Sequence, residues 1–269
     1  MMKKFIFIAI AVILAACNDD RTLTIIHLND LHSHVDPERA GEFKGHGGAI
    51  ENAMYIDSVR NADGARNTLL LLAGDFSQGT SYFTEMGGDI EIDLLNATGY
   101  DVVTLGNHEF DNGPVELARR LSSLKPEVVC ANYDFTGTVL EPYVKPYTIV
   151  RRAGKKIGII GLLTDISRVV DVSQLGTIQY QEPAPIVNRL AAFLDEEKDC
   201  DLVICLSHLG YSEDCELAAQ VSDVDIIVGG HSHTDLDEIT FVKDLDGDEV
   251  AIVQDGFWGL TVGNLKVSF

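Results

Sequence analysis

The sequence predicts an α/β fold, a layered sandwich built as a single domain over residues 22–269. Two observations predict this fold: short apolar, β-branched runs recur along the chain, and helical patterns lie between several of them. The length of 269 residues suffices for one large α/β domain or two small ones. No internal repeat and no linker rich in Pro, Gly or Ser divides residues 22–269, so we expect one domain.

The predicted strands are almost continuously hydrophobic, as is typical of strands that are covered on both faces. Eight runs share this property: Leu23–Leu28, Thr68–Leu72, Asp101–Leu105, Glu127–Cys130, Lys156–Leu162, Asp201–Leu206, Val224–Val228 and Val250–Val253. Two intervening segments are predicted helices. Residues 113–124 begin with Gly-Pro, a favourable helix entry, and residues 186–194 repeat apolar side chains at helical spacing.

The segment from Asp244 to Asp248 has the composition of a calcium-binding loop. An EF-hand loop needs glycine at its sixth position, whereas Gly247 is fourth and Glu249 is sixth. Strand-like residues flank the segment on both sides. We therefore expect a hairpin turn here.

The first twenty residues have the character of a targeting segment. Lys3 and Lys4 precede an apolar run, Phe5–Ala16, that is too short to cross a bilayer comfortably. The run ends in Leu14-Ala15-Ala16-Cys17, which resembles a bacterial lipoprotein signal; the alternative is an ordinary cleaved signal with an incidental cysteine. We expect a signal peptide over residues 1–16, acylation of Cys17, and a tether over residues 17–21. The protein would then be exported to the cell envelope of a bacterium and contact the membrane only through its lipid anchor.

Four further cysteines are Cys130, Cys200, Cys205 and Cys215. None forms a C-x-x-C pair, which argues against a zinc ribbon or a thioredoxin-like motif. Cys205 lies in an apolar run and is expected in the core. An exported compartment permits a disulfide among these residues, but the sequence does not assign a pairing.

The net charge of −22 argues against nucleic acid or an anionic membrane surface as a partner, because both require basic surface. An anionic phosphate ester would also need local positive charge. In so acidic a chain, a bound metal ion is the natural source of it.

Polar residues follow five of the predicted strands at their carboxyl ends, where open α/β sheets place their sites. The five segments are Asn29-Asp30-Leu31-His32, Gly74-Asp75, Gly106-Asn107-His108-Glu109-Phe110-Asp111, Ser207-His208 and Gly229-Gly230-His231-Ser232-His233. Taken singly, each has a structural explanation: aspartate and asparagine cap helices and turns, and a lone histidine is often a hydrogen-bonded core residue. Because all five segments follow a strand at its carboxyl end, we interpret them as parts of one shared site and not as separate structural residues. If residues 231–233 are extended, the two histidines share one side of the chain.

Imidazole and carboxylate ligands together suit Zn, Mn or Fe, whereas an all-oxygen set would favour Mg or Ca. One carboxylate can bridge two cations, and such a pair holds a phosphoryl group and lowers the pKa of bound water. The residues therefore predict a site for one divalent metal ion or two neighbouring ones, which would supply the positive charge that a phosphorylated small-molecule substrate needs.

These five segments resemble, in order, the motifs of calcineurin-like metallophosphoesterases, and more closely those of the N-terminal metal-binding domain of bacterial 5′-nucleotidases. Further segments of the same subfamily are Gly74–Thr80, Gly99-Tyr100-Asp101, Pro146-Tyr147 and Lys156–Gly161. The resemblance covers essentially all of residues 22–269. It implies a four-layer α/β/β/α sandwich of mixed sheets.

The resemblance also implies a role for each matching residue. One metal ion would be held by Asp30, His32, Asp75 and His233. The second would be held by Asp75, Asn107, His208 and His231, with Asp75 bridging the two. His108 and Asp111 would form a catalytic dyad that assists the departing oxygen while a metal-bound hydroxide attacks phosphorus.

The expected activity is hydrolysis of phosphate esters, most closely that of a 5′-nucleotidase in nucleotide catabolism. Full-length relatives carry a second domain that binds the base, and the sequence ends at Phe269, after the expected last strand of the metal domain. One alternative is therefore the catalytic half of a split 5′-nucleotidase with a separately encoded substrate-binding partner. The motifs are also compatible with a cyclic-nucleotide phosphodiesterase, a hydrolase of sulfur esters, or a metal-bearing binding protein without turnover.

Overall fold

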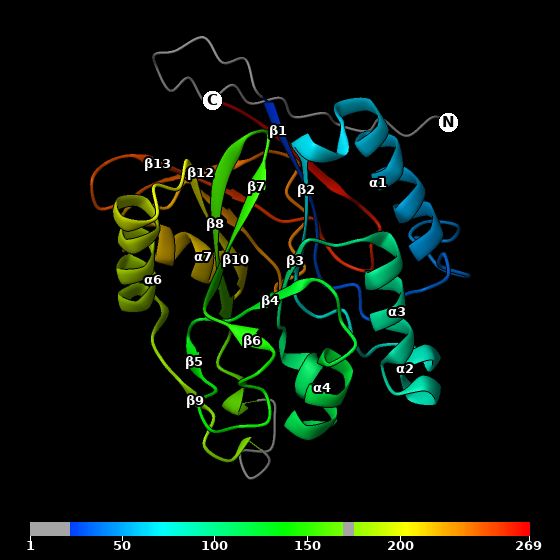
Figure 1. Ribbon diagram of the computed structural model, residues 1–269. Helices are drawn as coiled ribbons and strands as arrows, with labels where there is room; N and C mark the ends of the chain where they lie inside the picture. The colour runs from blue at the N-terminus through cyan, green and yellow to red at the C-terminus, as the bar shows by residue number, and fades with distance from the viewer. Residues whose placement is uncertain (1–21, 169–174) are drawn as a thin grey trace.

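Two six-stranded mixed sheets pack face to face and carry helices on their outer faces, as the computed structural model shows for residues 22–168 and 175–269 (Figure 1). The first sheet has the order β14 (Gly263–Ser268), β1 (Thr22–Leu28), β2 (Thr68–Ala73), β3 (Val102–Thr104), β4 (Glu127–Val129), β6 (Val144–Lys145). The second has the order β12 (Thr240–Lys243), β13 (Glu249–Val253), β11 (Ile226–Val228), β10 (Leu202–His208), β8 (Lys155–Leu163), β7 (Tyr147–Arg152). The short strands β5 (Tyr133–Asp134) and β9 (Gln179–Tyr180) pair separately. The prediction of a layered sandwich with mixed sheets is confirmed.

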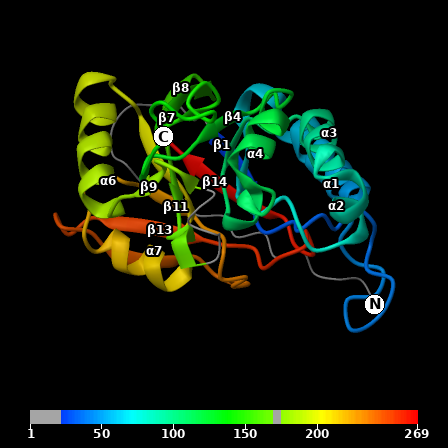
Figure 2. The same cartoon turned by 90° about the horizontal axis from the view of Figure 1, so that it is seen from below.

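The helices form the two outer layers, on opposite flanks of the sandwich (Figure 2). The first sheet is covered by α1 (Ala49–Asp63), α3 (Asp89–Thr98) and α4 (Gly113–Leu121), with the short α2 (Ser81–Met86) beside α3. The second sheet is covered by α6 (Pro183–Ala192) and α7 (Tyr211–Ala218). No helix in the described ranges combines the length and the apolar character that crossing a membrane requires.

Successive side chains of a strand point to opposite faces of its sheet, and this alternation produces the layers. In β2, Leu69 and Leu71 point into the apolar layer between the sheets, whereas Leu70 and Leu72 point toward the helices of the first sheet. All six residues of β2 are buried, because both of its faces are covered. The nearly continuous hydrophobicity of these strands follows from this double burial.

Each of the eight predicted strands is present, within a few residues at its ends. Both predicted helices are also present. One is α4, which ends at Leu121, and the other is α6, which is followed by a π-helical turn over Phe193–Glu197. The hairpin is also confirmed: β12 and β13 pair antiparallel, and the Asp244 carboxylate accepts the N–H groups of Asp246 and Asp248 within the turn. All four cysteines in the described ranges are free thiols, and Cys205 is fully buried. Cys17 lies outside the described residues.

Gly161 of β8 fixes how closely the two sheets approach. A Cβ atom there would collide with backbone atoms of Val129 and Cys130 at the end of β4, in the opposite sheet. We predict that Gly161→Ala lowers the free energy of unfolding by about 2 kcal/mol or more, because backbone in a packed sheet cannot move aside.

The matched control is Gly158→Ala in the same strand, where the three atoms nearest to the added Cβ all belong to the Leu194 side chain. A side chain can shift, so we expect a loss below about 1 kcal/mol. Urea denaturation of both variants measures the difference, and equal losses would contradict the role given to Gly161.

Candidate metal centre

The carboxyl ends of strands from both sheets meet at one place. The loops after β1, β2 and β3 come from the first sheet, and those after β10 and β11 from the second. Backbone hydrogen bonds join the first two loops: Asp30 N–H donates to Gly74 O at 3.1 Å, and His32 N–H to Asp75 O at 3.0 Å. The predicted ligands are therefore carried by loops that hold one another in place.

The first group of potential ligands consists of Asp30, His32 and His233, whose ligand atoms all lie within 4.8 Å of one another. Asp30 Oδ1 is 3.2 Å from His233 Nε2. The Nε2 atoms of His32 and His233 are 3.0 Å apart. Asp30 is completely buried, whereas the His233 side chain is 38% exposed, so the group is open to solvent on the His233 side.

The second group consists of Asp75, His208 and His231. Asp75 Oδ2 lies 3.1 Å from His208 Nε2 and 3.8 Å from His32 Nε2, and so stands between the two groups. Asn107 follows β3, and its buried Oδ1 has no hydrogen-bond partner. The seven residues predicted as metal ligands are thus brought to one region of the described structure.

His108 and Asp111 lie beside this region on a 3₁₀ turn, Asn107–Phe110, and the residue after it. His108 Nδ1 is 2.9 Å from Asp111 Oδ2, and the His108 backbone N–H donates to Asp75 Oδ1 at 2.9 Å. His108 also forms a third group with His32 and Asp75. Its side chain is 32% exposed, so it can meet a molecule arriving from solvent.

Three of the predicted ligands carry buried polar atoms that make no hydrogen bond of good geometry: Asp30 Oδ1, Asn107 Oδ1 and His208 Nε2. Of these, Asp30 Oδ1 and His208 Nε2 have only an ion-pair neighbour, His233 Nε2 at 3.2 Å and Asp75 Oδ2 at 3.1 Å. A buried polar atom left in this state costs roughly 1–3 kcal/mol. Carboxylate oxygen, amide oxygen and imidazole nitrogen are all donors to divalent cations. The residues therefore fit a metal centre, because cations would bind oxygen and nitrogen atoms that make no hydrogen bond.

The pKa values in the centre show how strongly its charges interact. Burial disfavours the charged Asp75 carboxylate, but His208 and His32 outweigh it, and the pKa of Asp75 lies well below its usual range. Burial would likewise lower the pKa of His208, yet the Asp75 and Asp30 carboxylates raise it to about 10. Without a cation, protons on imidazole supply the positive charge that these carboxylates require.

The backbone at this site is strained. Five of the predicted ligands have positive φ angles: Asp30 (50°), His32 (47°), Asp75 (49°), His231 (74°) and His233 (55°). The interpretation of residues 231–233 as an extended segment is therefore wrong: the left-handed conformation at both histidines directs His231 toward His208 and His233 toward His32. His208 also differs slightly from expectation, because it is the last residue of β10 and does not follow the strand.

Glycines allow the loops to close in. A Cβ on Gly74 would collide with the His208 ring, and one on Gly106 would collide with Asp75. Gly74 thus lets a ligand of the second sheet approach the first, and Gly106 lets the loops after β2 and β3 approach each other.

Sequence reasoning missed the residues that position the ligands. The completely buried Glu109 accepts the N–H groups of Asp75 (2.9 Å), Ser77 (3.0 Å) and Gly106 (2.6 Å), and burial raises its pKa to about 7. Arg120 donates to Glu109 O at 2.8 Å and to Ser77 Oγ at 3.0 Å. Glu109 adjoins His108 in the same motif, a signal that could have identified it. Arg120 lies in the following helix, α4, and nothing in the sequence distinguishes it from the other polar residues of that helix.

Asn29 performs a similar task on the other side. Its Nδ2 donates to Asp30 Oδ2 at 2.8 Å and to Gly256 O at 2.6 Å, while its Oδ1 accepts the Asp255 N–H. The Asp30 carboxylate is thus oriented by its own neighbour, and also by the His231 N–H, which donates to Oδ2 at 2.9 Å.

Comparison with known proteins agrees with this geometry. Residues 23–235 match the model of the calcineurin-like phosphoesterase family. A probable 5′-nucleotidase of Treponema pallidum is 33% identical over 301 residues, which cover 100% of this chain and 50% of that protein. The chain thus spans about half the length of the curated relatives it matches.

Solved structures show the same similarity. The 5′-nucleotidase precursor of Thermus thermophilus superimposes with a TM-score of 0.85 at 36% identity, covering 92% of this chain and 51% of that one. The NAD nucleotidase of Haemophilus influenzae gives a TM-score of 0.82 at 32% identity, covering 92% and 47%. The chain belongs to the calcineurin-like phosphoesterase family.

Proposed function

We propose that this protein hydrolyses phosphate monoesters at a dinuclear metal centre, with nucleotides as its substrates. Asp30, His32, Asp75 and His233 would hold one cation, and Asp75, Asn107, His208 and His231 the other. The observation that carries the proposal is the set of buried ligand atoms on Asp30, Asn107 and His208 that make no hydrogen bond within the described structure. The mixed nitrogen and oxygen donors favour Zn, Mn or Fe. Bound cations of this kind neutralise phosphoryl charge and lower the pKa of water.

The dyad is suited to general-acid catalysis. The hydrogen bond that His108 donates to the Asp111 carboxylate outweighs the effect of burial and raises the pKa of His108, which favours the imidazolium. Because Nδ1 is engaged by Asp111, the proton available to a substrate is on Nε2. His108 can therefore donate a proton to the departing ester oxygen.

Nucleotide substrates are supported by relatives that are 5′-nucleotidases. The chain spans about half the length of those proteins. The nucleotide substrate and any separately encoded binding partner are therefore both proposals for this chain. Nucleotide turnover that appears only on adding such a partner, with activity on a small aryl phosphate retained throughout, would favour the split form of the enzyme.

The metal centre is tested by removing Asp75, the proposed bridge. We predict that saturating Mn²⁺ or Zn²⁺ raises the Tm of chelator-treated protein by about 5–10 °C, and restores phosphatase activity on a panel of nucleotides. Asp75→Asn should lose most of both effects. The control is Asp57→Asn, because that carboxylate is 70% exposed on α1. Activity that survives both chelation and Asp75→Asn would refute the proposal.

The dyad gives a pH prediction. An acid must be protonated, so the rate should fall as pH rises through the pKa of His108. Asp111 raises that pKa, and Asp111→Asn should therefore move the falling limb of the pH–rate profile toward lower pH. Profiles of kcat/KM for the variant and for Asp89→Asn, an exposed control, measure the shift. A limb that does not move would exclude His108 as the acid.

We also propose that acylated Cys17 holds the protein at the bacterial cell envelope. The support is the sequence: two lysines, an apolar run and the Leu14–Cys17 segment. Cys17→Ser should move the protein from the membrane fraction to the soluble fraction of an expressing bacterium. Unchanged fractionation would contradict the lipid anchor.

A further inference from the structure

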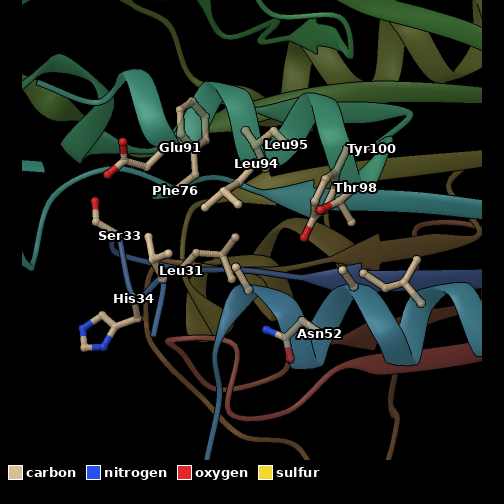
Figure 3. Close-up of a pocket in the computed structure, with 14 residues that line it drawn as sticks. Leu31, Ser33, His34, Asn52, Phe76, Glu91, Leu94, Leu95, Thr98 and Tyr100 are labelled. Atoms are coloured by element: carbon tan, nitrogen blue, oxygen red, sulfur yellow. The ribbon is translucent and has the colours of Figure 1, made fainter. Parts of the chain in front are cut away.

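The loops that carry the proposed metal ligands differ in what holds them. Those after β1 and β2 border a small apolar cavity between α1 and α3, which is lined by Leu31, Ser33 and Phe76 from these loops (Figure 3). Its volume of about 50 Å³ is well below the roughly 300–1,000 Å³ that is usual for pockets of organic ligands. The cavity is therefore too small for such a ligand, and these two loops are held by Asn29 and Glu109.

The loop after β11 carries a ligand for each proposed cation. His231 belongs to the group around Asp75, and His233 belongs to the group around Asp30. Both histidines have a left-handed backbone, with φ angles of 74° and 55°, a conformation that such residues keep only where surrounding contacts hold it. The position of this one loop therefore decides where one ligand of each cation lies.

Gln254 holds this loop through its side-chain amide. The residue follows β13, which pairs in parallel with β11, and it is only 1% exposed. Its Nε2 donates to Gly230 O at 2.6 Å. Its Oε1 accepts the Thr234 N–H at 2.7 Å and the Ser232 hydroxyl at 2.8 Å. The three residues that Gln254 binds thus alternate along the chain with the two histidines.

These three bonds require an uncharged amide. A backbone carbonyl accepts and a backbone N–H donates, so Gly230 fixes which amide atom is the nitrogen and Thr234 fixes which is the oxygen. A carboxylate in this place can accept from Thr234 but has no proton to donate to Gly230. Methionine has a similar length but no N–H or O–H group, and its thioether is only a weak acceptor.

Ser232 connects the same loop to the outer helices of the second sheet. Its hydroxyl oxygen accepts the N–H of Tyr211, the first residue of α7, at 2.9 Å, while its proton is donated to Gln254. The loop is thus held from two elements, from β13 through Gln254 and from α7 through Tyr211. Neither of these residues is a proposed ligand, so the loop is held without use of the atoms that would bind cations.

We propose that Gln254 is a positioning residue that sets the affinity of the centre for both cations at once. This inference rests on the proposed dinuclear metal centre. Without the three bonds, the left-handed conformation at His231 and His233 loses contacts that hold it, and the two imidazoles are no longer oriented for their cations. Binding of either cation must then also order the loop, which weakens both binding steps.

Calorimetric titration of the chelator-treated full chain with Mn²⁺ tests this role. Gln254→Met keeps the size of the side chain and removes the hydrogen bonds, and it should raise both dissociation constants about tenfold or more. Because the ligands themselves are still present, kcat on a nucleoside monophosphate at saturating Mn²⁺ should stay close to that of the unaltered protein. By contrast, His233→Ala removes the ligand of one cation and should weaken one binding step far more than the other.

Ser232→Ala gives the same test without a change in the core, because Ser232 is exposed. The substitution removes one of the two bonds to Gln254 Oε1 and should raise both dissociation constants about threefold. In the Gln254→Met background it should add little, because its partner is already gone.

Asn188→Leu is the matched control. The Asn188 amide likewise donates to a backbone carbonyl, that of Gln220 at 2.9 Å, and accepts a backbone N–H, that of Ser222 at 2.9 Å. These bonds join α6 to the loop before β11, and neither partner is a proposed ligand. Their loss should lower the Tm and leave both dissociation constants for Mn²⁺ unchanged.

The outcomes separate this role from the proposed function. Unchanged dissociation constants in folded Gln254→Met, a change in only one of them, or an equal change in Asn188→Leu would overturn the positioning role and leave the metal centre intact. If Gln254→Met does not fold, unchanged constants in Ser232→Ala overturn the role in the same way. A folded, unaltered chain that binds no divalent cation would overturn the proposed function and this inference together.

Discussion

The buried carboxylates of Asp30 and Asp75, surrounded by four imidazoles, are the interaction on which the rest of the structure depends. Two anions at this depth are tolerated only with compensating positive charge. Protonated histidine supplies part of it in the protein alone, as the pKa of His208 shows. Divalent cations would supply it more completely, and would also bind the ligand atoms that make no hydrogen bond.

Much of the surrounding architecture keeps these groups in place. Glu109 gathers three backbone N–H groups around Asp75, Asn29 orients Asp30, and Gly74 lets the His208 ring approach. The left-handed backbone conformation at five ligands is energetically unfavourable, and the rigid sheets beneath these ligands hold it in place. This arrangement is typical of sites that are organised before their ligand binds.

The surroundings of the centre are asymmetric. The His108–Asp111 dyad lies on one side. On another side, the His233 ring stacks on Phe257 with centroids 5.1 Å apart, which supports that ligand from behind. The dyad and the metal ligands are thus connected through one set of loops.

The sequence alone determined the layered fold, the eight main strands and the identity of the candidate ligands. It could do so because strands buried on both faces are recognisable by composition, and because Asp, Asn and His recur where such strands end. Tertiary structure decided what depends on distant contacts. The pairing of β14 with β1, the left-handed turns at His231 and His233, and the support from Arg120 arise from residues far apart in the chain. The contact of Gln254 with residues 230–234 is of the same kind, because its side chain reaches them only after β13 has paired with β11.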